Sequence, residues 1–291
     1  MATHPQRARS NRATARLIEL AHARVDERGR WNSAARSLEF QRTMRLLGQH
    51  LQPRSRLLEL GATSSLYSSA LARRGHQMTF LSTRPKSLQK ARREFNEHHL
   101  EAHVGLVHTA QLGALPLKTR VDFDAVLIFE PLLHLLEADA RAQMAREALR
   151  VLRDGGHLIA HFFPPASGYI RALGLAEIYP EEIDEASIER VFDTHILRCD
   201  CAPGGLQFEP EYYMSLAEVT ELFAPLGVEF LDAQSLNGIA ARREAEFLKL
   251  GDESPRIFEV CRDLLEQSSR DPEIIATGDR AAWVGRKMLR H

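Results

Sequence analysis

Short apolar runs alternate with longer amphipathic stretches through the middle of the chain. The runs, which are typical of buried strands, fall at 57–60, 78–81, 104–107, 123–129 and 157–162. Apolar residues at helical spacing predict helices between them, at 66–74, 86–96 and 138–152. We expect the last of these helices to end on a glycine cap at 154–156. Strands and helices that alternate in this way predict an α/β fold with a mostly parallel sheet and helices on both faces.

The rest of the sequence adds helices before and after this pattern. Helical spacing predicts two helices between residues 13 and 51. It also predicts later helices at 216–223, 240–250 and 256–267, with strands at 228–231 and 281–287. We expect the second of these strands at an edge of the sheet. The expected organisation is a tail with helices at 1–52, a core at 53–163, a helical cap insertion over the open end of the sheet at 164–213, and the remaining core at 214–291.

The composition narrows the class of protein. With 291 residues, the chain exceeds the roughly 250 at which a single core stops growing, which indicates one elaborated domain or a domain with a cap. Its 38 basic and 39 acidic side chains nearly cancel, so charge gives no support for a nucleic acid or an anionic membrane as partner. The longest apolar stretch, 124–136, is too short to span a membrane. Three cysteines without a CxxC pair and a start without an apolar signal core lead us to expect a cytoplasmic protein that holds no metal.

Residues 56–68 form the most informative segment, a strand that enters a tight turn and then a helix, with the sequence Arg-Leu-Leu-Glu-Leu-Gly-Ala-Thr-Ser-Ser-Leu-Tyr-Ser. The segment resembles the cofactor loop of class I S-adenosylmethionine (SAM) dependent methyltransferases, where an acid is followed by three glycines at alternate positions. Further segments resemble this family in the same order, at 78–92, 122–134, 150–156, 212–219 and 283–287. The likeness covers about residues 30–288 and implies the family's Rossmann-like fold with a seven-stranded, mostly parallel sheet.

The resemblance also implies which positions would contact SAM. They lie in the first loop and after the second, third and fourth strands, at Glu59, Gly61, Ala62, Ser64, Ser82, Thr83, Thr109, Ala110 and Phe129. In the family, the glycines of the first loop let the backbone approach the methionine part of SAM closely. Glu59 and Gly61 match the family pattern.

Four other positions depart from that pattern. Thr63 and Ser65 replace the second and third glycines, and a side chain in a left-handed backbone conformation costs about 1–2 kcal/mol. The loop therefore has another shape or does not close on SAM. Ser82 and Thr109 stand where the family has acids that bind the ribose hydroxyls and the adenine amino group, and each lost charge-assisted hydrogen bond costs about 1.5–3 kcal/mol. The sum, about 3–6 kcal/mol against the ~8 kcal/mol of a micromolar complex, predicts weak SAM binding in the ordinary pose.

The candidate catalytic residues lie at the carboxyl ends of the predicted strands, where ligands bind in such sheets. Glu130 and His134 follow the fourth strand, and a histidine with a pKa near neutrality suits acid/base work on a small acceptor. Tyr213 opens a later helix and could stack on an aromatic substrate, or pack in the core. His161 ends the fifth strand and could face the pocket or the core, and His134 could simply be bonded to backbone at a helix start.

Three functions follow from these observations. The leading hypothesis is a diverged methyltransferase-like protein that acts on a small organic molecule, has an eroded SAM site and does not carry out conventional SAM-dependent methyl transfer. The alternative is a SAM-dependent O-, N- or C-methyltransferase of small molecules with an atypical cofactor loop. A third hypothesis is a non-catalytic partner that pairs with itself or with another methyltransferase-like chain. The fold alone does not choose among them, because this scaffold supports many chemistries.

Overall fold

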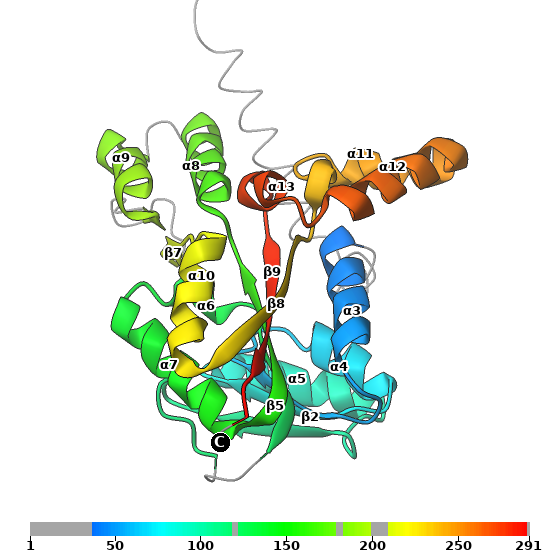
Figure 1. Cartoon of the computed structure of the whole chain (residues 1–291), viewed down its shortest axis with the longest axis vertical. Coiled ribbons are helices and arrows are strands. Elements are labelled where there is room, and N and C mark those ends of the chain that lie inside the picture. Colours follow the sequence, from blue (N-terminus) through cyan, green and yellow to red (C-terminus); the bar gives the residue numbers. More distant parts are fainter. Residues whose placement is uncertain (1–36, 118–121, 179–182, 199–208, 290–291) are drawn as a thin grey trace, which may run out of the picture.

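The computed structural model describes residues 37–117, 122–178, 183–198 and 209–289. A seven-stranded sheet runs through its centre in the order β3-β2-β1-β4-β5-β9-β8 (Figure 1). The strands are β1 (Arg56–Leu60), β2 (Gln77–Ser82), β3 (Val104–His108), β4 (Phe123–Ile128), β5 (Leu152–Phe162), β8 (Val228–Ser235) and β9 (Ala281–Lys287). β1 to β5 and β8 run in one direction, and β9, which pairs antiparallel with both β5 and β8, is the single reversed strand of this sheet; this confirms the predicted Rossmann-like α/β fold.

The strand at 281–287 is not at the edge of the sheet, contrary to the prediction. β9 lies between β5 and β8, and β8 forms the edge. Its residues from Ala281 to Gly285 are buried, and the Trp283 indole donates to Thr220 Oγ1 at 3.1 Å. A strand covered on both faces reads as a continuous apolar run, whereas an edge strand tolerates charges such as Glu229 of β8.

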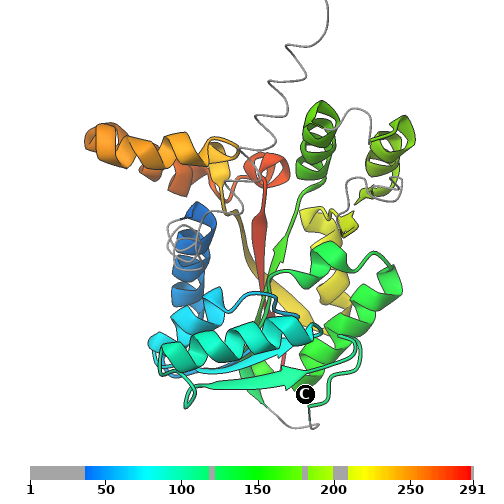
Figure 2. The same ribbon diagram turned by 180° about the vertical axis from the view of Figure 1, so that it is seen from behind.

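Two layers of helices bury the faces of the sheet (Figures 1 and 2). One face packs against α3 (Leu38–His50), α4 (Leu66–Arg73) and α5 (Pro85–Glu97). The other packs against α7 (Ala138–Val151) and α10 (Leu216–Phe223). Successive side chains of a strand point to opposite faces of the sheet. Leu57 and Leu58 of β1, for example, belong to the core clusters on the two different faces.

The predicted glycine cap at 154–156 is also wrong. Helix α7 ends at Val151, and its C-cap Leu152 is already extended, with φ −83° and ψ 130°. Leu152 pairs with Phe123 of β4, so the sheet takes up the chain directly after the helix. Gly155 has a φ of +72° and instead serves a turn inside β5.

Most of the remaining elements lie beyond the carboxyl ends of the parallel strands, whereas the 3-10 turn at Ala224–Leu226 precedes β8 at the opposite edge. The remaining elements are α6 (Pro131–His134), α8 (Pro165–Ile178), α9 (Glu185–Thr194), β6 (Ile196–Leu197), β7 (Glu211–Tyr212), α11 (Glu244–Glu253), α12 (Pro255–Ser268), α13 (Pro272–Thr277) and the 3-10 turns at Ala224–Leu226 and Gly238–Ala240. In Figure 1, α8 and α9 rise on one side of β9, and α11 and α12 extend on the other. The first predicted helix and Cys199 and Cys201 lie outside the described residues.

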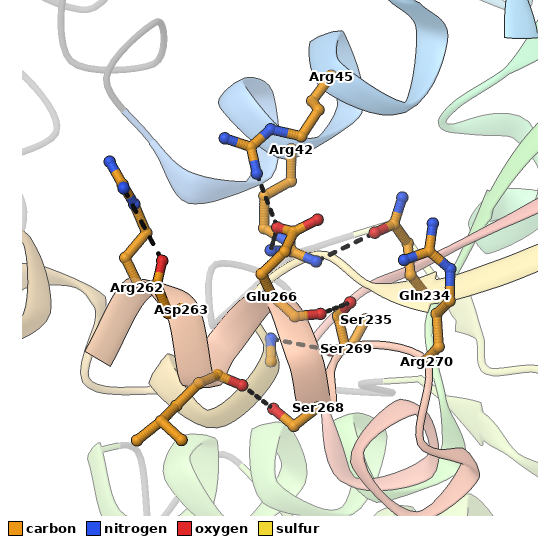
Figure 3. A network of polar contacts seen from close by, with 12 residues as sticks. Arg42, Arg45, Gln234, Ser235, Arg262, Asp263, Glu266, Ser268, Ser269 and Arg270 are labelled. Atoms are coloured by element: carbon orange, nitrogen blue, oxygen red, sulfur yellow. Dashed lines mark hydrogen bonds and ion pairs between the residues drawn. The ribbon is translucent and has the colours of Figure 1, made fainter. Parts of the chain in front are cut away.

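A polar network fixes α3 against the C-terminal part of the chain (Figure 3). Arg42 is buried, and its guanidinium donates to Glu266 Oε2 of α12 at 2.8 Å and to Gln234 Oε1 of β8 at 3.0 Å. Arg45 donates to the same Glu266 oxygen at 2.9 Å. The contacts hold α3 against the sheet, where its side chains also contact Tyr67 and His161.

Candidate functional site

The loop after β1 packs directly against the loop after β4. Gly61 has a φ of +71°, and a Cβ on it would overlap Pro131 and come within 3.1 Å of Leu112 Cδ1. Glycine is needed here for its backbone angle and for room, because the protein itself occupies the space beside it.

A hydrogen bond joins the same two loops. The Thr63 hydroxyl donates to Glu130 Oε2, and Glu130 precedes α6 as its N-cap residue. Because the order of the sheet reverses between β1 and β4, this bond crosses the switch point at which doubly wound sheets bind ligands. We call Gly61, Thr63, Glu130 and Pro131 the β1–β4 junction.

The two side chains that replace glycines are not in the left-handed conformation. Neither Thr63 nor Ser65 has a positive φ, and Ser65 begins α4 with φ −84° and ψ 5°. At these two positions the loop therefore has a backbone conformation that side chains allow without strain.

Glu59 is buried beneath this loop. The Ser68 hydroxyl of α4 donates to its carboxyl group. Burial raises the pKa of Glu59 to about 8; the hydrogen bond from Ser68 opposes this rise, and the charge of Glu130 adds a smaller one. Glu59 is therefore mostly neutral at pH 7.

The other predicted cofactor positions make local contacts. Ser82 is buried, and its hydroxyl accepts from the Arg84 backbone N–H at 3.2 Å. The buried Thr109 donates to the carbonyl of Gln111 at 2.8 Å. The remaining positions are the buried Ala62, which donates its N–H to the Leu81 carbonyl, the exposed Ser64 and Ala110, and the half-buried Thr83.

Phe129 belongs to an aromatic cluster under α3. Its ring centroid lies 4.5 Å from that of Tyr67 and 4.2 Å from that of His161, on which it stacks. The Tyr67 hydroxyl donates to Glu39 Oε1 at 3.0 Å, and His161 Nε2 lies 3.2 Å from Thr43 Oγ1. Burial lowers the pKa of His161 well below its usual value, which keeps the ring neutral.

A cavity of about 570 Å³ opens beneath α8, near the carboxyl end of β5. Its apolar wall includes Leu133, Phe163, Ile170 and Leu175. Its polar groups are Arg171, Glu211, Tyr213, Arg242, Asp279 and Arg280. This volume suits a small organic molecule, and we call the space the α8 cavity.

Tyr213 supplies a hydroxyl to the wall of the α8 cavity. It donates to Glu211 Oε2 at 2.5 Å, and Arg171 Nε lies 2.6 Å from the same oxygen. Burial, followed by the charge of Glu211, raises the pKa of Tyr213 far above its usual value. The hydroxyl therefore stays protonated at every physiological pH.

The structure separates the four predicted catalytic residues. Glu130 lies in the β1–β4 junction, Tyr213 lines the α8 cavity, and His161 lies in the aromatic cluster. His134 is at the other end of α6, where Nδ1 is 3.4 Å from the Pro210 carbonyl and 3.8 Å from Glu209 Oε2. In the described part of the chain no hydrogen bond joins Glu130 to His134. Their catalytic roles stay predictions.

The sequence analysis missed the charged groups of the α8 cavity, namely Arg171, Glu211, Arg242, Asp279 and Arg280. A weak signal existed at Arg171, the single basic residue of the mostly apolar α8. The others come from separate segments with no local pattern. Over the residues the structure covers, no three His, Cys, Asp or Glu side chains cluster as metal ligands would. Within the same residues, no helix combines the length and apolar character that crossing a membrane requires.

Comparisons with known proteins agree with this architecture. Residues 58–160 match the family model described as a methyltransferase domain, while no curated protein matches the chain. A SAM-dependent methyltransferase from Methanosarcina mazei has a similar structure, with 14% identity, a TM-score of 0.57, and coverage of 84% of this chain and 98% of that one. The [4+2]-cyclase SpnF is also similar, at 18% identity and a TM-score of 0.52, covering 86% and 81% of the two chains. A protein of Haloferax volcanii, solved in complex with the Trm112 methyltransferase activator, reaches 15% identity and a TM-score of 0.50, covering 86% and 89%.

Proposed function

We propose that this chain, whose residues 58–160 match a methyltransferase domain, acts on a small organic molecule without conventional SAM-dependent methyl transfer. The observation that carries the proposal is the β1–β4 junction. There Pro131 fills the space beside Gly61, and Thr63 donates to Glu130 across the switch point. In the family this is where the methionine part of SAM approaches the backbone, so these residues do not fit SAM in its ordinary pose.

The remaining cofactor positions support the same proposal. The hydroxyls of Ser82 and Thr109 are engaged in turns of their own loops, and neither carries the charge that a ribose or adenine anchor needs. Glu59 is mostly neutral at pH 7 and bonded to Ser68. Recovering these groups for a cofactor would require breaking hydrogen bonds that the protein already makes.

We assign the substrate to the α8 cavity. Tyr213 would offer its protonated hydroxyl there, and Glu211, its acceptor, would be the nearest base. Glu130 and His134 remain acid/base candidates at the two ends of α6, whose Leu133 lines the cavity. The similarity in fold to a [4+2]-cyclase agrees with a scaffold that serves chemistry other than methyl transfer.

Calorimetric titration with SAM and S-adenosylhomocysteine, from micromolar to millimolar concentration, tests the proposal. We expect no saturable heat from folded protein below the high-micromolar range. Low-micromolar binding of either compound would overturn the proposal, because it would mean that other groups replace the lost anchors.

The second candidate is a SAM-dependent small-molecule methyltransferase with an atypical loop. It is favoured by the family match over 58–160 and by the retention of Glu59 and Gly61. Transfer of label from methyl-labelled SAM to a small acceptor would establish it, whereas a site that binds neither SAM nor its product would exclude it.

The third candidate is a partner subunit without activity of its own. The observation in its favour is that the similar Haloferax volcanii protein was solved bound to a methyltransferase activator. Native mass spectrometry of the full chain would show self-association, and a monomer that turns over a small molecule would exclude this role.

A further inference from the structure

The α8 cavity has more positive than negative groups in its wall. Three guanidinium groups, from Arg171, Arg242 and Arg280, face two carboxylates, from Glu211 and Asp279. Arg171 and Glu211 pair on the side next to Tyr213. The other two arginines pair with Asp279 and with Glu39 of α3, and the donors that they keep beyond these pairs indicate what the cavity can bind.

Arg242 is held in an unusual backbone conformation. Its φ is +64°, in the left-handed region that L side chains rarely adopt. Asp279 fixes it there, since Oδ2 accepts the Arg242 backbone N–H at 3.0 Å and Oδ1 lies 3.3 Å from Nε. Nη2 donates to the Thr277 carbonyl at 3.1 Å, while Nη1 has no hydrogen bond among the described residues. Strained residues held by several contacts concentrate at functional sites.

Arg280, which directly follows Asp279 in the chain, is also held by two contacts. Its guanidinium lies over the Phe163 ring, 4.3 Å from the centroid, and Nη1 donates to Glu39 of α3. Its Nε and Nη2 have no hydrogen bond within the part of the chain that the structure describes. Arg280 therefore has donors that no described residue uses. It lines the same cavity as Arg242, whose Nη1 is also unused, and as the Phe163 ring.

We infer that the α8 cavity binds a small organic carboxylate. The carboxylate lies between Arg242 and Arg280, because guanidinium groups bind planar anions through paired charge-assisted hydrogen bonds. The apolar body of the ligand packs on Phe163, Ile170 and Leu175. The inference rests on the proposed function in one respect, since it names the substrate class of the same cavity.

Matched neutral and anionic probes test this inference. The probes are 4-phenylbutyrate and its amide, 4-phenylbutyramide, titrated into the full chain by calorimetry in the absence of SAM. We expect the acid to bind at least about tenfold more tightly than the amide, and added salt to narrow the difference. Equal affinity for the two probes, or no binding of the acid at millimolar concentration, would overturn the inference.

Substitution of the two arginines locates the binding site. In the double variant Arg242→Gln with Arg280→Gln, we expect the affinity for the acid to fall at least about tenfold and that for the amide to stay within about twofold. Arg256→Gln on α12 is the matched control, because Arg256 is exposed and outside the cavity. A double variant that keeps the preference for the acid would also overturn the inference.

Thermal unfolding with and without 4-phenylbutyrate checks that the variants fold. Arg242→Lys replaces the double variant if that variant does not fold, because lysine keeps a cation beside Asp279 but lacks the planar guanidinium group. We expect Arg242→Lys to bind 4-phenylbutyrate more weakly and to bind 4-phenylbutyramide as the wild type does. None of these titrations contains SAM. Failure of the carboxylate inference is therefore distinct from failure of the proposed function, which the SAM titration decides.

Discussion

The β1–β4 junction and the α8 cavity lie at the same edge of one sheet, yet their polar groups are used differently. In the junction, hydroxyl and carboxylate groups satisfy one another, as Thr63 and Glu130 do. In the cavity, charged groups surround open space, and Arg242 and Arg280 keep donors without partners in the described residues. The comparison teaches that a retained fold preserves the place for a ligand, while the loop side chains decide whether that place is open.

The largest effect is expected from filling the space in the junction. Gly61→Ala places a Cβ against Pro131 at a φ of +71°, and we expect a loss of about 3–5 kcal/mol in the free energy of unfolding. Urea unfolding measures this loss. Gly75→Ala is the matched control, because Gly75 has a φ of +88° but nothing within 4 Å of a Cβ, so only about 1–2 kcal/mol should be lost. Equal losses would mean that Pro131 does not close the junction.

The next largest effect concerns the buried Glu59. Its pKa rises from 4.5 to about 8 on folding, so the folded state binds the proton more tightly and stability falls as pH rises from 4.5 to about 8. Glu59→Gln should remove this dependence. We expect the wild type to lose about 2–4 kcal/mol relative to the variant over this window, measured by urea unfolding at several pH values.

The burial of His161 changes stability with pH in the opposite direction, and it does so at lower pH. Because its pKa in the folded state is below 6.5, its contribution to stability increases with pH and levels off above 6.5. The comparison of wild type with Glu59→Gln cancels this contribution, since both proteins keep His161. A constant difference between the two proteins from pH 5 to 8 would contradict the assignment of a neutral Glu59.

Opening the junction should restore some affinity for SAM. In Thr63→Gly with Glu130→Gly, the hydrogen bond across the switch point is removed and the backbone becomes accessible. We expect SAM to bind at least about tenfold more tightly than to the wild type, about 1.4 kcal/mol, by calorimetry. Ser64→Gly is the control, because Ser64 is exposed in the same loop. No gain in the double variant would show that the junction is not what limits SAM binding.

The smallest effects come from removing one hydroxyl, either from the aromatic cluster under α3 or from the wall of the α8 cavity. Tyr67→Phe breaks the bond to Glu39 Oε1, which keeps its bond from Arg280, and we expect a loss of about 1 kcal/mol in stability with at most a twofold change in the binding of 4-phenylbutyrate. Tyr213→Phe removes one of the two donors to Glu211 and leaves Arg171 as the other, so the carboxylate of Glu211 is less well compensated in the cavity wall and we expect a few-fold weaker binding of 4-phenylbutyrate. Calorimetry and urea unfolding of both variants separate the two regions, and similar changes in 4-phenylbutyrate binding would contradict their separation.

The fold could be predicted because buried strands are continuous apolar runs that a local pattern reveals, as in β4. Which strands are neighbours is not local, and this is why 281–287 was wrongly expected at an edge. The departures at Thr63 and Ser82 were visible because motif spacing is local. The partners of Arg242 and Arg280 were not, because Asp279 and Glu39 reach them only after long-range folding.

The buried Arg42 and its partners give α3 a particular place in the order of assembly. Arg42 and Glu266 are 224 residues apart, and Glu39 and Arg280 are 241 apart. Helix α3 thus makes several of its polar contacts with segments that are synthesised long after it. Because contacts of such separation form late, we expect α3 to dock after the sheet is complete. Until then the aromatic cluster of Tyr67, Phe129 and His161 is uncovered, and a nascent chain stopped before α12 should be bound by chaperones at this face.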